Sequence, residues 1–197
     1  DHQIGNHGNG ENEMRKFFAT VTATGAIVFG AVPMAQAQTT VLDPAAGTYT
    51  FDGMAELSVG PISPECNLEL TGDVQTNNDG SVTIDVTDGN VSGGGACGLI
   101  DLRFEPAWTV TVPQNDLPTN ANPSRPVVGT FQNVIVDYSF LIGNATCDGG
   151  PSEVEATFMN GMPISEDSSF VFNDTFGECS VNGTVDAQQD INVLVSG

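Results

Sequence analysis

Short runs in which apolar and polar residues alternate recur along most of this chain, and they constrain its fold more than any other feature. In residues 81–87, Val82, Ile84 and Val86 alternate with polar side chains, and this two-residue period places one face of a β-strand against a core. Helical spacing of apolar residues is not sustained over ten or more residues anywhere. We therefore predict an all-β fold, either a β-sandwich or a flattened barrel of about eight to ten antiparallel strands. Strands are predicted at residues 47–59, 67–75, 81–87, 107–112, 130–141, 153–158, 168–173, 179–186 and 190–195.

Turn-forming residues separate these runs. The clearest hairpin is predicted around residues 77–80, NNDG, because Asn, Asp and Gly tolerate the positive φ that tight turns require. Residues 113–126 contain four prolines, which block ladder pairing, so we expect an exposed connection there, serving either as a plain connector or as a binding loop. Residues 130–141 are apolar on both faces near their end, which is typical of a central strand.

Residues 14–37 have the three parts of a secretory signal peptide. Arg15 and Lys16 form a charged start, residues 17–32 form a mostly apolar run, and residues 35–37 form an A-x-A cleavage site. The apolar run has 16 residues, fewer than the about 20 that a transmembrane helix needs. We therefore expect no transmembrane segment in the exported protein.

Processing divides the chain into three parts. We expect cleavage between Ala37 and Gln38, and we interpret residues 1–13 as translation assigned from upstream of the true start. A chain of this size buries about 70% of its extended surface around one core, so residues 38–197 are predicted to be a single β domain, secreted after passing through the periplasm.

All four cysteines lie in that domain, and an even number in an exported protein indicates disulfides. A metal site is the weaker interpretation, because the domain has no C-x-x-C pair and no histidine. Three pairings are possible. We favour Cys66 with Cys97 and Cys147 with Cys179, because the two separations, 31 and 32 residues, are nearly equal.

The charge balance excludes several classes of partner. Lys+Arg 4 against Asp+Glu 25 gives a formal net charge of −21, which argues against nucleic acid and against a polybasic contact with anionic lipid. His2, His7 and Lys16 all precede Gln38, so the exported domain has neither residue type. A Ser-His-Asp or Cys-His site, a lysine Schiff base, a P-loop and a histidine-ligated zinc cannot be built without them. We expect neither an enzyme nor a cofactor.

The acidic residues permit two site interpretations. Residues 75–80 resemble half of an EF-hand loop, but Val86 stands where calcium coordination needs a glutamate, and a hairpin turn explains the same residues. Paired carboxylates could serve a glycosidase, yet no motif selects a pair among the 22 acidic residues of the domain. Solvated strand faces are the simpler explanation, and the negative charge favours solubility.

The segment from Cys66 through LTGDVQTNNDGSVTIDV to VSGGGACGLIDLRFEPAWTVTV has a distinctive order: a cysteine opening a strand, a DG hairpin, a small-residue stretch ending in A-C-G-L, and P-x-W-T-V. It resembles the secreted alkane-oxidation activator proteins of the Pra type, over roughly residues 48–190. This chain is more acidic than that family. Trp108 is most simply a core residue. The matching residues are Cys66, Gly72, Asp79, Gly80, Cys97, Gly98, Leu99, Pro106, Trp108 and Thr109, and NATC and GECSVNGTV lie where the family has its second cysteine pair.

The resemblance implies an extracellular factor that helps cells take up or emulsify long-chain hydrocarbon, separate from the oxidising enzymes. Our first hypothesis is thus a non-enzymatic protein that contacts hydrocarbon or lipid through an apolar cleft or patch. The alternative is self-association as a structural subunit of a surface fibre or biofilm matrix, with residues 38–51 as a donated strand. A hydrolase that uses carboxylates alone is the third hypothesis.

Overall fold

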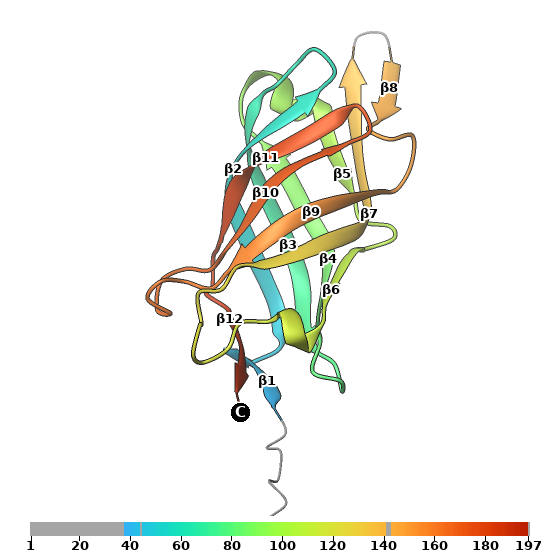
Figure 1. Ribbon diagram of the computed structural model, residues 1–197. Helices are drawn as coiled ribbons and strands as arrows, with labels where there is room; N and C mark the ends of the chain where they lie inside the picture. The colour runs from blue at the N-terminus through green and yellow to red at the C-terminus, as the bar shows by residue number, and fades with distance from the viewer. Residues whose placement is uncertain (1–37, 44, 141–142, 197) are drawn as a thin grey trace, which may run out of the picture. The chain divides into compact units, whose positions relative to one another are not determined.

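Strands dominate the computed structural model, which describes residues 38–43, 45–140 and 143–196 (Figure 1). The all-β prediction is confirmed. The predicted cleavage site at Ala37 and the last residue of the predicted strand 130–141 lie outside the described residues. The elements are β1 (Thr39–Asp43), β2 (Gly47–Val59), β3 (Glu65–Thr76), β4 (Val82–Ser92), the 3-10 helix η1 (Gly95–Leu99), β5 (Ile100–Arg103), β6 (Trp108–Val112), the 3-10 helix η2 (Gln114–Asp116), β7 (Val127–Phe140), β8 (Gly143–Thr146), β9 (Ser152–Met159), β10 (Ser169–Phe176), β11 (Cys179–Ala187) and β12 (Asn192–Ser196).

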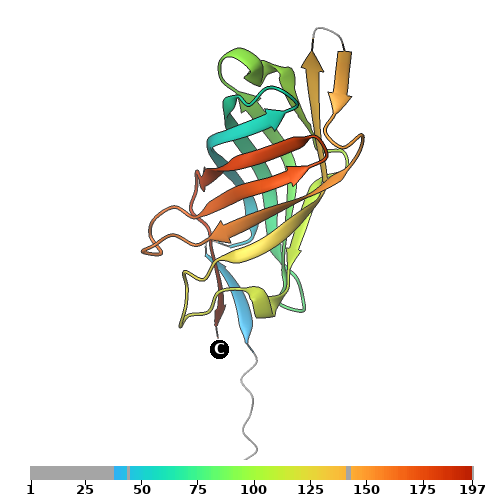
Figure 2. The same ribbon diagram turned by 45° about the horizontal axis from the view of Figure 1, so that its top comes forward.

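Eight of these strands close into an antiparallel barrel. The order around the wall is β7-β6-β4-β3-β2-β11-β10-β9, and β9 pairs back onto β7. Of the two predicted architectures the barrel is therefore correct. Figure 2 shows β7, β9, β10 and β11 on one side of it, with β3, β4 and β6 on the other. Beyond the wall, β5 and β8 extend β7, while β1 and β12 form a separate two-stranded sheet.

The long strand β7 closes the barrel because it changes partners halfway. Its register shifts between Phe131 and Val134, where Asn133 adopts a φ of 65°, a left-handed conformation that Asn tolerates better than most residues. Its first half pairs with β9 and its second half with β5 and β8. The predicted central position of this strand is confirmed.

The predicted hairpin joins β3 to β4. Gly80 has a φ of 81°, and the Asp79 carboxylate accepts hydrogen bonds from the backbone N–H of Ser81 at 3.0 Å and from its hydroxyl at 2.6 Å. The strand after the turn runs to Ser92 and does not end at the predicted residue 87, because Thr87 is accommodated as a β-bulge between the pairs Thr71 with Asp88 and Gly72 with Val86.

The barrel interior is packed with side chains. Phe170 lies at its centre, with ring centroids 5.0 Å from Phe51, 5.1 Å from Phe158 and 5.8 Å from Phe131. Each aromatic pair of this kind stabilises the fold beyond simple burial. Leu117, in the proline-rich connection, is also buried, so this mostly exposed segment covers one end of the barrel as well as linking β6 to β7.

Both disulfides have the predicted sequential pairing. Cys66 is bonded to Cys97, with Cα atoms 5.6 Å apart, and Cys147 to Cys179, with Cα atoms 5.4 Å apart. Cys66 is the second residue of β3 and Cys179 the first of β11, and these two strands flank β2. The bonds therefore attach η1 and the turn after β8 to neighbouring parts of the same barrel end.

Candidate functional site

The residues that carry the family resemblance do not converge on one site. Asp79 and Gly80 form the β3–β4 turn, whereas Gly98 and Leu99 lie in η1, beside the Cys66–Cys97 disulfide. Most of these residues therefore act in turns and strand pairing. Two members of the set reach cavities: Trp108 lines the cavity described below, and Gly72 lines a smaller one.

Gly72 and Thr109 have local structural roles on opposite sides of β4. A Cβ at Gly72 would lie 2.8 Å from the carbonyl oxygen of Asp85, so glycine permits the close approach of β3 to the bulged strand. The Thr109 hydroxyl donates a 2.6 Å hydrogen bond to the Asp85 carboxylate. Pro106 precedes β6 in a cis peptide bond with Glu105.

Trp108 begins β6 and points into the barrel, as predicted for a core residue. It is 7% exposed, and its ring centroid lies 4.7 Å from that of Phe104. The indole Nε1–H donates to the carbonyl oxygen of Arg103. The polar atom of the indole is thus satisfied by backbone, and its carbon face is left for apolar contact.

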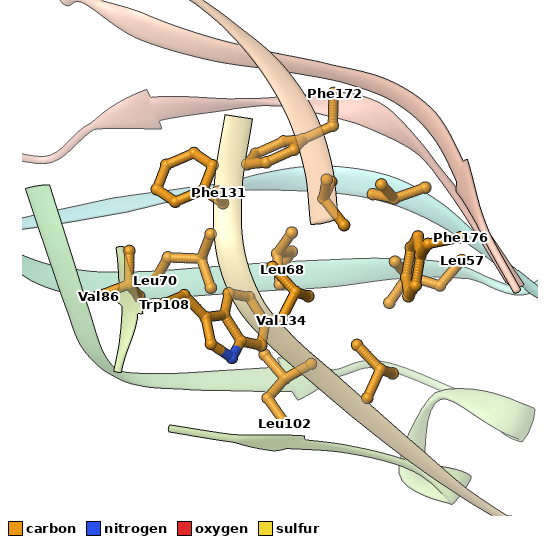
Figure 3. Close-up of a pocket in the computed structure, with 13 residues that line it drawn as sticks. Leu57, Leu68, Leu70, Val86, Leu102, Trp108, Phe131, Val134, Phe172 and Phe176 are labelled. Atoms are coloured by element: carbon orange, nitrogen blue, oxygen red, sulfur yellow. The ribbon is translucent and has the colours of Figure 1, made fainter. Parts of the chain in front are cut away.

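A cavity of about 40 Å³ lies against this indole (Figure 3). Every residue that lines it is hydrophobic, and no lining side chain can act as a nucleophile, a general acid or base, or a metal ligand. Apolar contact is what this arrangement can offer a ligand. The lining residues are Leu57, Leu68, Leu70, Val86, Leu102, Trp108, Phe131, Val134, Val136, Val154, Phe172, Phe176 and Val181.

The size of the cavity limits what it can hold. A dry protein cavity that binds benzene has about 150 Å³, so 40 Å³ accommodates neither a ring nor a long chain in this conformation. A second cavity, of about 30 Å³, is lined by Phe51, Leu117 and Ile191 among others, and Phe131 contributes to both. A long hydrocarbon would have to displace Phe131 to occupy the interior.

The outer surface beside Trp108 carries an ion pair. Arg103 Nε lies 2.6 Å from Asp137 Oδ2, and Thr146 donates a 2.6 Å hydrogen bond to the same carboxylate. Arg103 is 49% exposed, so the pair contributes about 0–1 kcal/mol at most. It links β5, β7 and β8 and adds no chemistry to the cavity.

The acidic residues form rows on the outer wall. Asp52 in β2 lies directly opposite Glu69 in β3 and Asp186 in β11, and Asp73 lies opposite Asp85. Among the residues that the structure describes, no group of three or more His, Cys, Asp or Glu side chains could hold a metal ion. The Asp79 carboxylate is engaged by Ser81, and these hydrogen bonds hold its pKa below the usual value.

Sequence reasoning located part of the cavity lining. The predicted strand 168–173 contains Phe172, although its inward face was not predicted, and Trp108 is predicted to lie in the core. It missed Leu102, because β5 has four residues and pairs only with a strand distant in sequence. A four-residue strand has no usable periodicity of its own.

None of the helices in the described part of the chain is long and apolar enough to cross a membrane.

Comparison with known proteins gives one family. A family model for alkane oxidation protein activator PraA/PraB-like proteins matches residues 12–195, nearly the whole chain. No curated protein and no solved structure matches. The matched region contains the barrel, both disulfides and the whole cavity lining.

Proposed function

Because the chain belongs to the PraA/PraB-like alkane oxidation protein activator family, we propose that it aids alkane oxidation by contact with the hydrocarbon, outside the oxidising enzymes. In this proposal it is an extracellular, non-enzymatic protein that promotes uptake or emulsification of hydrophobic substrate. Its two disulfides are consistent with an oxidising compartment.

Membership of the family carries the proposal, and the exclusively hydrophobic lining of the cavity beside Trp108 supports its non-enzymatic part. An enzyme that activates an unreactive chain needs a metal, a cofactor or an acid-base pair at the reacting atom, and this lining supplies none of these. The domain from Gln38 onward has no histidine or lysine. Apolar contact supports emulsification or transfer better than bond making.

The test combines a physical and a biological measurement on the purified protein. The protein should adsorb to hexadecane droplets and lower the tension of the hexadecane–water interface. It should also be folded when it desorbs. Added to cells, it should accelerate growth on hexadecane and leave growth on a water-soluble carbon source unchanged. The proposal fails if the protein neither lowers the tension nor binds hexadecane. Covalent conversion of hexadecane by the protein alone would instead make it an enzyme.

A second candidate function, a fibre subunit, is favoured by the position of β1. Residues 38–51 are predicted to act as a donated strand. Of these, residues 39–43 lie outside the barrel, paired with β12 of the same chain from Thr39 opposite Ser196 to Asp43 opposite Asn192, whereas residues 47–51 belong to β2 in the barrel wall. Exchange of this strand between copies would link them in a chain. Deleting residues 38–47 should abolish polymers, whereas a monodisperse monomer at high concentration would contradict this function.

A further inference from the structure

The two sides of the barrel wall differ in their outward side chains. On β7, β9, β10 and β11 one continuous row has no charge: Val128 lies opposite Thr157, Thr157 opposite Val171, and Val171 opposite Thr184. Figure 2 shows these four strands side by side. We call this row, together with Met159 at the end of β9 and Met162 and Ile164 in the following loop, the neutral face.

The neutral face contains four large hydrophobic residues that are exposed. Val128 is 55% exposed, Met159 37%, Met162 64% and Ile164 42%. These are four of the seven large hydrophobic residues with high exposure in the described part of the chain. Scattered exposed hydrophobics are ordinary, but a group on one face with a polar rim marks an interaction surface. Glu155 and Asp186 lie on β9 and β11 beside the uncharged row, and Glu166 and Asp167 lie in the same loop as Met162 and Ile164; we call these four residues the acidic rim.

The opposite side of the wall is acidic. The outward positions of β2, β3 and β4 include Asp52, Glu69, Asp73 and Asp85, some directly opposite one another. One large hydrophobic residue, Met54, is exposed there, at 51%, and its register partner is Asn67. The outward rows of the wall therefore differ: carboxylates face one another on β2, β3 and β4, whereas the row from Val128 to Thr184 has no charge.

We propose that the neutral face is the surface through which the barrel contacts neutral liquid hydrocarbon, with the acidic side turned to water. This inference rests on the proposed function and locates its contact surface outside the small cavity. A protein of this kind would adsorb at the hydrocarbon–water boundary in one orientation.

The net charge of the domain indicates which kind of partner can bind the neutral face. The domain from Gln38 to Gly197 has two arginines against 22 acidic residues, so 2 minus 22 gives a net charge of −20. An anionic membrane and a second copy of the chain would both be repelled by this charge and by the acidic rim. A neutral hydrocarbon has no charge to repel, and its adsorption needs only apolar area.

The dimensions also suit a long chain. The row from Val128 to Thr184 crosses three strand spacings, or about 14 Å at about 4.8 Å each. One leaflet of a bilayer holds extended hydrocarbon chains in about 15 Å. A chain of that size can lie across the whole row, in contact with the methyl groups of valine and threonine.

Matched substitutions test the orientation. Val128→Asp and Met162→Asp each place a carboxylate on the neutral face, and Met54→Asp makes the same change at similar exposure on the acidic side. Binding of each purified full-length variant to hexadecane droplets is measured at fixed salt, with thermal unfolding as the control for folding. Met162 lies in a loop, so its variant keeps the test valid if Val128→Asp fails to fold.

We expect each neutral-face variant to bind droplets about tenfold more weakly, since transfer of one such side chain from water accounts for about that factor. Met54→Asp should bind within about twofold of the unsubstituted protein. Equal losses at Met54 and at the neutral face, or no loss at the neutral face, would overturn the inference while leaving the proposed function intact. Failure of the unsubstituted protein to bind droplets would overturn both.

Two further measurements test whether the neutral face binds a second copy of the chain or an anionic lipid surface in place of hydrocarbon. Light scattering should find a monomer, and a dimer that Val128→Asp dissociates would make the face a self-interface and overturn the inference. Vesicles of phosphatidylglycerol should bind the protein at least tenfold more weakly than hexadecane droplets, because the acidic rim repels them. Equal binding to these vesicles would assign the face to anionic lipid instead.

Discussion

The indole Nε1–H of Trp108 donates a 2.7 Å hydrogen bond to the backbone carbonyl oxygen of Arg103. This bond joins the first residue of β6 to the last residue of β5. Leu102, the neighbour of Arg103, contributes to the cavity lining. The ring of Trp108 thus lines the cavity, while its indole N–H is hydrogen-bonded to β5, the strand that supplies Leu102 to the same lining.

Replacing Trp108 with Phe should lower the free energy of unfolding by about 1–3 kcal/mol, because the Arg103 carbonyl loses its donor while an aromatic ring remains. Urea unfolding followed by far-ultraviolet circular dichroism measures this, since the chain has one tryptophan and the variant has none. An unchanged urea midpoint would show that the hydrogen bond does not stabilise the fold. Thr111→Val, at an exposed position on the same strand, serves as the control.

Asn160 is buried between the end of β9 and the C-terminal strand. Its side-chain amide donates to the carbonyl oxygens of Pro123 and Val193 at 2.8 and 2.9 Å and accepts from the Val193 N–H at 2.9 Å. Asn160→Ala should therefore cost about 2–4 kcal/mol, at about 1 kcal/mol or more for each hydrogen bond. Exposed Asn90→Ala should change stability by less than about 0.5 kcal/mol. Hydrogen exchange at Val193 that did not accelerate would contradict this assignment.

Each disulfide closes a loop of similar length, so the two should contribute equally. Paired alanine substitution of Cys66 and Cys97, or of Cys147 and Cys179, should lower the free energy of unfolding by about 3–4 kcal/mol in the chain-entropy model. Urea titrations of the two double variants measure this. A large difference between them would show that one bond also holds the folded barrel end in place, beyond its effect on the unfolded chain.

Asp79 should make stability depend on pH in the acid range. The Ser81 hydroxyl and N–H donate to the carboxylate and lower its pKa in the folded protein. The unfolded chain then binds the proton at higher pH than the folded one. The stabilisation is fully present above the ordinary aspartate pKa and is lost as pH falls through the lower folded value. The stability difference between the protein and Asp79→Asn should therefore be constant near neutrality and shrink towards pH 2. A difference that grew on acidification would reverse this sign.

Salt should stabilise the barrel. Carboxylates lie directly opposite one another at Asp52 with Glu69 and at Asp73 with Asp85, and like charges in such positions destabilise a sheet. Raising the salt concentration from 0.01 to 1 M shortens the screening length from about 30 to about 3 Å, so the thermal midpoint should rise. Glu69→Gln should have a smaller salt dependence, and an unsubstituted protein insensitive to salt would refute the expectation.

The local pattern was enough to predict most of the wall. Alternation placed β2 at residues 47–59, and turn chemistry identified the β3–β4 hairpin. The predicted strand ends at residue 87, before the observed end of β4 at Ser92, because Asp88 and Gly89 are residue types typical of turns. In the structure a Cβ at Gly89 would lie 2.6 Å from the Glu69 carbonyl oxygen, so this glycine permits close packing and forms no turn.

Long-range pairing was beyond the sequence pattern. The barrel closes because β7 pairs with β9, although β8 lies between them in the sequence. The neutral face depends on the same pairing, which places Val128 opposite Thr157. Val128 and Val171 each look like ordinary alternating residues in sequence. The strand prediction also missed β5 and β8, which have only four residues each.

The pairing of Thr39 with Ser196 brings the first and last strands together at the pole away from the disulfides (Figure 1). A tether attached at Thr39 or at Ser196 would therefore hold the described domain by this pole, away from the uncharged row on β7, β9, β10 and β11.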